Sequence, residues 1–182
     1  HKPLEKEPIH PIPLKIDHRE RNSGMLKVLE PYTNQLQVET VELKTGDYLL
    51  NNQIIIERKR LADFILSIKT GRLFQQAHRM GNTKYHPLLI LEGDKSEIRQ
   101  SKMKREAIQG TLLHLSVFLG IPILRSANIQ ETAQLIYFTT TQLLEGHHPR
   151  SHQPIVKSPA TKLNKKQKTA ISVLSNIPGI GS

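Results

Sequence analysis

The first third of the chain alternates hydrophobic and polar residues in a way that predicts short strands. Residues 14–17 read as one strand, and residues 37–43 alternate as a strand does when only one of its faces is buried. Residues 48–50 and 53–59 are expected to pair as a hairpin around Asn51 and Asn52, because asparagine tolerates the positive φ that such turns need.

Helices are predicted where apolar residues recur at a spacing of three or four. A short helix over residues 23–29 is expected to be capped by Ser23. Four longer helices are predicted over residues 61–68, 73–80, 102–118 and 131–144. The aliphatic runs at 88–91 and 121–124 indicate buried strands between these helices. Strands that alternate with helices predict an α/β domain around one sheet.

Proline and glycine positions divide the chain into four parts. Residues 1–13 contain four prolines and are expected to form an extended arm, which precedes a domain over residues 14–146. Residues 147–161 hold three prolines and read as a linker to a last part, residues 162–182. Because the chain opens without a methionine or a signal-peptide pattern, we expect it to be a piece of a longer protein.

The charge of the chain favours a polyanionic partner. The 182 residues carry 26 lysines and arginines against 16 carboxylates, a net charge of +10. Aromatic residues make up 4% and tryptophan is absent, so we expect recognition of a nucleic-acid backbone rather than base stacking. The absence of cysteine excludes disulfides and thiolate metal sites, and the nine histidines lack the spacing of a zinc site. The apolar runs are too short to span a bilayer, so no membrane partner is expected.

Charged residues that follow the aliphatic run 54–56 suggest a catalytic site. On a strand, Glu57 and Lys59 share a face, and Asp47 on the other arm of the hairpin approaches Glu57 across the ladder. Two carboxylates held this close repel unless one is protonated or a divalent cation lies between them. The pattern therefore predicts hydrolysis of phosphodiester bonds assisted by Mg²⁺ or Mn²⁺.

Lys59 and Asp63 are the residues expected to complete this site. The ammonium group of Lys59 can orient the attacking water and stabilise negative charge that develops on the phosphate. Asp63, near the start of the next helix, can pair with Lys59 or act through a water molecule.

At these residues the sequence resembles the XPF-type structure-specific endonucleases, including the archaeal Hef nuclease domain. The shared pattern is a Gly-Asp-Tyr at 46–48, a strand that ends in Glu-Arg-Lys at 57–59, and an aspartate at 63. Two further elements match, the Asp-x-Arg-Glu at 17–20 and the Gly-Arg-Leu at 71–73 with its downstream Gln76 and Met80. The likeness covers residues 14 to 145.

The resemblance implies a restriction-endonuclease-like fold, with a central mixed sheet flanked by helices. It implies that a metal ion is held by Asp17, Asp47 and Glu57 and that Lys59 is the catalytic lysine, with Arg58 and Asp63 assisting. Further support is expected from Arg19, Glu20, Arg72 and Gln76. Such enzymes cut duplex DNA near a flap, a fork or splayed arms, in repair or fork processing.

Residues 165–181 resemble the first half of a helix-hairpin-helix module, with Pro-Gly-Ile-Gly as its hairpin. Glycines permit the tight turn, and amides at a following helix start bind phosphate without reading base sequence. The residues expected to contact DNA are Lys162, Lys165, Lys166, Lys168, Gly179 and Gly181. The chain stops at Ser182, so we expect the module to be truncated.

The sequence therefore predicts a metal-dependent endonuclease that acts on branched DNA, inside the cell and with the chromosome. The resemblance implies a homodimer formed through the nuclease domain, and the apolar face with Ile108, Leu112, Leu115 and Leu119 is either core or part of that interface. Two alternatives remain open, a catalytically silent module that binds branched DNA and another acid-x-Lys nuclease such as a junction resolvase.

Overall fold

A six-stranded mixed sheet forms the centre of the computed structural model, which describes residues 10–155. The strands are β1 (Ile12–Asp17), β2 (Leu36–Val41), β3 (Tyr48–Leu50), β4 (Ile54–Arg60), β5 (His86–Glu92) and β6 (Ile123–Ser126). They lie in the order β2-β1-β3-β4-β5-β6, and β3 is antiparallel to both neighbours while the other pairs are parallel. The mixed sheet flanked by helices that was predicted is confirmed.

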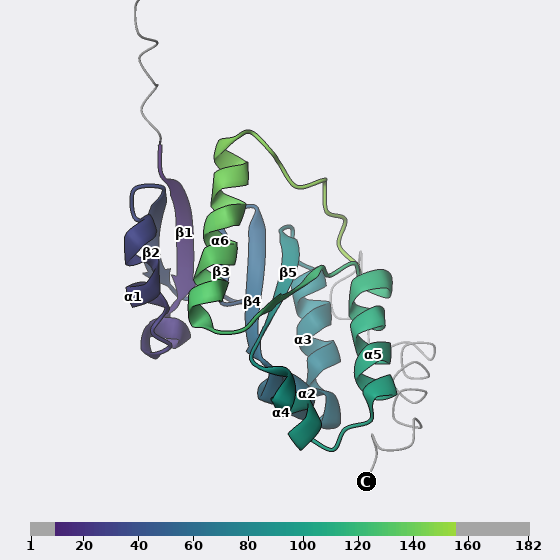
Figure 1. The fold of residues 1–182 in the computed structure, drawn as a ribbon. Helices are drawn as coiled ribbons and strands as arrows, with labels where there is room; N and C mark the ends of the chain where they lie inside the picture. The colour runs from purple at the N-terminus through teal and green to yellow at the C-terminus, as the bar shows by residue number, and fades with distance from the viewer. Residues whose placement is uncertain (1–9, 156–182) are drawn as a thin grey trace, which may run out of the picture.

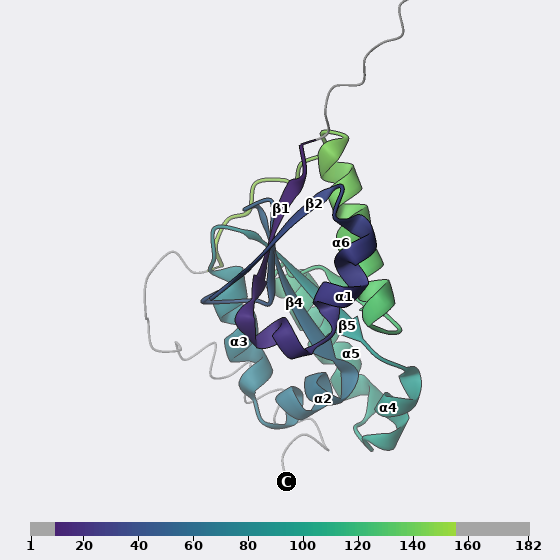
Figure 2. The same cartoon turned by 90° about the vertical axis from the view of Figure 1, so that its left-hand side faces the viewer.

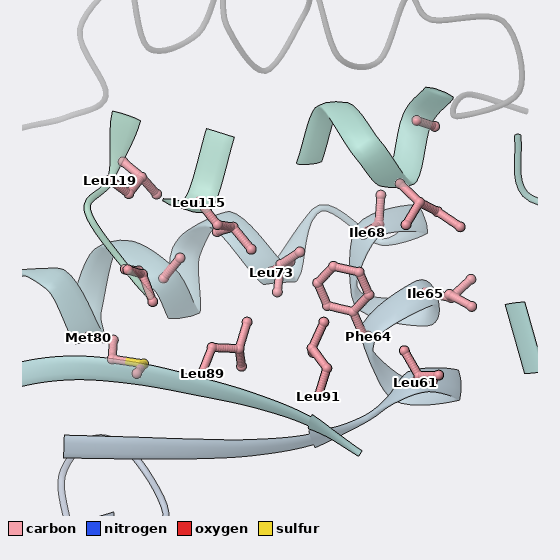
Figure 3. Packing of buried hydrophobic residues seen from close by; sticks show 14 of the residues in the cluster. Leu61, Phe64, Ile65, Ile68, Leu73, Met80, Leu89, Leu91, Leu115 and Leu119 are labelled. Carbon is pink, nitrogen blue, oxygen red and sulfur yellow. The ribbon is translucent and has the colours of Figure 1, made fainter. Parts of the chain in front are cut away.

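Helices cover both faces of the sheet, so that it separates two hydrophobic clusters (Figures 1 and 2). The helices are α1 (Met25–Leu29), α2 (Leu61–Lys69), α3 (Arg72–Gly81), α4 (Lys95–Gln100), α5 (Arg105–Leu113) and α6 (Ile129–Leu144). Side chains of α2, α3 and α5 pack with Ile55, Leu89 and Leu91 on one face (Figure 3). Side chains of α1 and α6 pack with Leu14, Ile56 and Ile90 on the other. Successive residues of β4 and β5 therefore face different clusters, as strand geometry requires.

The hairpin β3–β4 forms around the predicted turn. Asn51 and Asn52 adopt φ of 51° and 49°, and the amide of Gln53 donates to the carbonyl of Leu50 at 2.9 Å. The positive φ at both residues matches the twist of the two strands, and because Leu50 pairs with Ile54, Gln53 is a third residue of the connection. The turn fixes the register Tyr48↔Ile56, which brings the residue before β3 alongside the end of β4.

The helix predicted over residues 102–118 forms, but it begins three residues later than expected. Lys102 has a φ of 56°, which no helix can accommodate, and α5 begins only at Arg105. The last turn of the predicted helix, His114–Phe118, is a π-helix, in which the amide of Leu119 reaches the carbonyl of His114. The helix α4 was not predicted, although Asp94 and Glu97 form its capping box.

Smaller differences concern the ends of elements. The strand β1 begins at Ile12, inside the expected extended arm, and β6 lies two residues further along than the predicted run 121–124. The helix α1 starts at Met25, after a 3-10 turn η1 (His18–Asn22), and a second such turn, η2 (Glu30–Tyr32), follows it. No helix within residues 10–155 is long and apolar enough to cross a membrane.

Candidate active site

Glu57 and Lys59 lie side by side on one face of β4, as the alternation of the strand predicts. The Nζ atom of Lys59 is 3.6 Å from Oε1 of Glu57, and 11% of the lysine side chain and 19% of the glutamate side chain are exposed. Behind them is a small cavity of about 20 Å³, which Gln76 and apolar residues of α3 and β5 also line. The pair therefore projects from the apolar cluster under α3, with little water to solvate it.

Asp47 precedes β3 and is held at the end of β4 by backbone and side-chain contacts. Its amide donates to the carbonyl of Ile56, and its Oδ2 accepts from the amide of Arg58, both at 2.8 Å. Gly46 makes this approach possible, because it has a φ of 75° and a Cβ there would lie 2.7 Å from the side chain of Ile55.

The carboxyl groups of Asp47 and Glu57 are both poorly stabilised as anions. Burial, followed by repulsion from Glu57, raises the pKa of Asp47 to about 7. Burial likewise raises the pKa of Glu57, although the attraction of Lys59 acts in the opposite direction. The site is therefore a place where an additional cation would lower the free energy of the ionised pair.

Asp17 lies next to Asp47 in the sheet, but its carboxylate already has partners. Its side chain is fully buried, with Oδ1 accepting from the amide of Arg19 at 2.9 Å and from the Nε of Arg19 at 2.5 Å. Oδ2 accepts from the amide of Leu43 at 2.7 Å. Burial opposes ionisation here, yet these hydrogen bonds outweigh it and lower the pKa of Asp17 to about 2.

Asp17 is therefore not drawn into a three-carboxylate set with Asp47 and Glu57. Within residues 10–155, no group of three or more histidine and carboxylate side chains is placed to hold a metal ion. In this arrangement Asp17 caps η1 and holds the loop after β2, and its assignment as a third carboxylate ligand stays a prediction.

Arg58 points to the opposite face of β4 and joins three elements there. Its Nε and Nη2 bind the two carboxylate oxygens of Glu92 at 2.7 and 2.5 Å, and its Nη1 lies 3.3 Å from Glu20. Glu20 also accepts from the hydroxyl of Tyr48, and Glu92 accepts from the hydroxyl of Thr132 at 2.7 Å. This network ties β4 to η1, β5 and α6.

The remaining predicted residues lie around the site. Arg19 is 61% exposed, and its charge attracts Asp47 and Glu57 as well as Asp17. Gln76 faces the cavity beside Glu57, and its Oε1 is buried without a hydrogen-bond partner within the described part of the chain. Arg72 is exposed and donates to Thr70 at 3.1 Å. Asp63 is exposed on α2, and Lys59 pairs with Glu57 rather than with it.

Three participants were not predicted from the sequence. Glu92 and Thr132 belong to the Arg58 network, and Arg79 on α3 attracts the carboxylate of Glu57. Glu92 had a detectable signal, since it ends an aliphatic strand as Glu57 does. Thr132 and Arg79 carried none, because threonine and arginine on helices are ordinary surface residues until packing places them.

The six residues expected to contact DNA near the end of the chain lie outside the described residues. These are Lys162, Lys165, Lys166, Lys168, Gly179 and Gly181. The arm at residues 1–9 and the end of the predicted linker, from residue 156, lie outside them as well.

Comparison with known proteins gives consistent matches. A family model described as the ERCC4 domain matches residues 16–139. The chain is 37% identical over 131 residues, 72% of its length, to a Methanocaldococcus jannaschii protein named for an ATP-dependent RNA helicase, and it spans 16% of that protein. It is 24% identical over 168 residues, 91% of its length, to the 3'-flap repair endonuclease Xpf of Saccharolobus solfataricus, of which it covers 70%.

Solved structures resemble the chain as well. XPF from Aeropyrum pernix matches with a TM-score of 0.61 and 27% identity, over 93% of this chain and 77% of that one. The same protein in complex with DNA matches with a TM-score of 0.62 and 24% identity, over 94% and 92%.

Proposed function

This chain belongs to the family of XPF-type nucleases that carry the ERCC4 domain, and on that premise we propose that it is a structure-specific DNA endonuclease. Its substrate is branched duplex DNA, cut near a 3'-flap, fork or splayed arms, in association with the chromosome. The single observation that carries the proposal is the buried pair Asp47 and Glu57, with Lys59 3.6 Å from Glu57.

The two carboxyl groups suit a divalent cation. Both have raised pKa values because they are buried and because Asp47 is repelled by Glu57, so a cation is the partner that this donor set lacks. We assign Asp47 and Glu57 as the protein ligands of Mg²⁺ or Mn²⁺, which take oxygen donors of this kind. When bound, the cation would polarise a phosphate oxygen and make water a stronger nucleophile.

The remaining groups orient the DNA and stabilise charge. Lys59 is fixed beside Glu57, so its ammonium group can donate to the attacking water or to a phosphate oxygen that gains charge. Arg19 presents an exposed guanidinium group within the field of both carboxylates, where it can bind a phosphate of the substrate strand. Asp17 orients Arg19 through two hydrogen bonds and is a positioning residue.

Arg58, Glu20, Arg72, Gln76 and Asp63 are assigned lesser roles. Arg58 anchors the strand segment that carries Glu57 and Lys59, and Glu20 links it to η1. Gln76 lines the cavity next to the pair, whereas Arg72 and Asp63 are exposed and available to DNA. We keep residues 162–182, with Lys162, Lys165, Lys166, Lys168, Gly179 and Gly181, as a further DNA-binding segment.

The proposal is tested by cleavage of a labelled 3'-flap, a plain duplex and a four-way junction by the wild type and Asp47→Ala, with Mg²⁺ and with EDTA. We expect flap cleavage that needs both Mg²⁺ and Asp47. The matched control is Glu145→Gln, which removes an exposed carboxylate at the end of α6. Equal cutting of all three DNAs would disprove structure specificity, and binding without cutting would favour the silent module.

We also propose that two copies pair through the side of the domain formed by α5, the π-helix after it and the edge strand β6. Of the apolar face considered in the sequence, Ile108, Leu115 and Leu119 belong to the core. The exposed apolar residues of this side are instead Leu113, Val117, Phe118 and Leu124. Val117 and Phe118 are each 68% exposed, and apolar groups concentrated beside an open sheet edge favour association.

Sedimentation of Phe118→Glu tests this pairing. The wild type is expected to sediment as a dimer and Phe118→Glu as a monomer, because a charge would have to be desolvated in the interface. Leu26→Glu is the control, since Leu26 is 39% exposed on α1, which packs on the other face of the sheet from α5. A monomeric wild type, or a dimeric Phe118→Glu, would overturn the proposal.

A further inference from the structure

The segment that follows α6 returns to the sheet and packs at the end of α3. Figure 1 shows this segment leaving α6 and crossing over the end of the sheet toward the side of α5. Its last described residues, 152–155, lie beyond the residues matched by the family model, which end at 139. We name residues 152–155 the strap.

Gly81, the last residue of α3, receives the strap. The amide of Ile155 donates to the carbonyl of Gly81 at 3.2 Å, and Nε2 of His152 lies 3.0 Å from the same oxygen. Both contacts satisfy a carbonyl at a helix C-terminus, where no further turn of the helix supplies a donor. The strap thus acts as part of the cap of α3.

Two side chains of the strap extend this contact into the domain. Ile155 packs against the hydrophobic cluster under α3, and the ring of His152 lies 5.7 Å from the ring of His86, the first residue of β5. A Cβ on Gly81 would lie 2.0 Å from Cδ1 of Ile155 and 2.9 Å from its Cγ1. A side chain at position 81 would therefore displace the side chain of Ile155 from the place it occupies.

We propose that the strap is a built part of the nuclease domain, docked on Gly81, and that it fixes the point from which the rest of the chain departs. The expected linker over residues 147–161 is then not free along its whole length. The chain continues to residues 156–182 from the C-terminal end of α3, the helix that carries Gln76 to the site and Arg79 within its field. The proposal does not depend on the nuclease activity.

Hydrogen exchange of the full chain tests the docking. Gly81→Ala is expected to increase exchange at the amide of Ile155 at least about tenfold, as a local opening equilibrium shifts. Gly110→Ala is the control, because a Cβ at that helical glycine meets nothing within 4 Å.

A double mutant separates steric release from a general loss of stability. Ile155→Ala removes Cδ1 and Cγ1 and leaves its Cβ 3.9 Å from the Cβ position of residue 81, an ordinary contact. Ile155→Ala alone is expected to release the strap partly, and Gly81→Ala added to it is expected to have no further effect. Unchanged exchange in Gly81→Ala, or equal effects of Gly81→Ala with and without Ile155, would overturn the proposal.

Discussion

The charged groups on the two faces of β4 differ in how completely they are paired. On one face, Arg58 is bound by both oxygens of Glu92 and by Glu20, and every partner has a further hydrogen bond. On the other face, Asp47 and Glu57 are buried together. The amide of Arg58, which donates to Asp47, and Lys59, 3.6 Å from Glu57, offset only part of the cost of their ionisation. The residues that make this difference are adjacent in the sequence.

The difference separates charges that are fully paired within the fold from two buried carboxyl groups that lack a cation. Ion pairs with complete hydrogen bonding hold β4, β5, η1 and α6 in place, because breaking one leaves a buried charge. The raised pKa values of Asp47 and Glu57 mark carboxyl groups whose ionised form a bound cation would stabilise, and such shifts are typical of catalytic sites. The ion pairs of Arg58 therefore hold in place the strand segment that carries its two sequence neighbours, Glu57 and Lys59.

The largest effect is expected on the cleavage rate, from a change on the face of β4 that carries Glu57 and Lys59. Lys59→Ala is expected to slow cleavage of a 3'-flap about 10²–10³-fold, because the ammonium group that stabilises negative charge developing on the phosphate is removed. Affinity for the same DNA should change by less than about threefold, since one contact among many is lost. Single-turnover rates and equilibrium binding measure the two effects, with Lys27→Ala on α1 as control. An equal loss of affinity would place Lys59 in phosphate binding instead.

Removing Arg58 from its network is expected to destabilise the domain rather than to change the chemistry of the candidate site. Arg58→Met leaves Glu92 and Glu20 without their cation and should lower the free energy of unfolding by about 3–5 kcal/mol. Urea denaturation measures it, and Arg105→Ala, an exposed arginine at the start of α5, should change it little. A loss below about 1 kcal/mol would mean that the network is not a main support.

The lowered pKa of Glu92, the partner of Arg58, predicts how the stability of the domain depends on pH. Burial opposes ionisation of Glu92, but the hydrogen bonds from Arg58 and Thr132 prevail and lower its pKa. The stability that Glu92 contributes is therefore complete above its unfolded pKa and is lost as the pH falls through its folded pKa. The difference in unfolding free energy between the wild type and Glu92→Gln should therefore stay constant from pH 7 down to about 5 and narrow as the pH falls below 4.5, the ordinary pKa of glutamate. A difference that widens toward acid would contradict this assignment.

The smallest expected effect concerns a neutral member of the network. Tyr48→Phe removes the hydroxyl that donates to Glu20 and should lower the unfolding free energy by about 1 kcal/mol. Cleavage rates should stay unchanged, because Glu20 keeps Arg58. Tyr85→Phe, in which no hydroxyl contact to the described residues is lost, is the control for the measurement by urea denaturation.

Local rules predicted the hairpin and the placement of Glu57 and Lys59, because alternation along a strand and the turn at Asn51 and Asn52 depend only on near neighbours. They placed the start of the helix predicted over residues 102–118 three residues too early. Lys102 leaves the helical region there and Met103 is buried, so packing of that loop overrode the local preference.

The sequence alone determined the α/β class, the hairpin and the acid-x-Lys strand, since each depends on residues within one or two turns of chain. Only the tertiary structure decided which carboxyl groups have a raised pKa and which a lowered one. The carboxylate of Asp17 is stabilised by Arg19 and by the amide of Leu43, 26 residues away. Asp47 and Glu57 are instead buried together, and Glu57 repels the ionised form of Asp47. The strap on Gly81 likewise depends on residues 71 or more positions apart. Burial and long-range hydrogen bonds set the energy of a charge, and neither is encoded in local spacing.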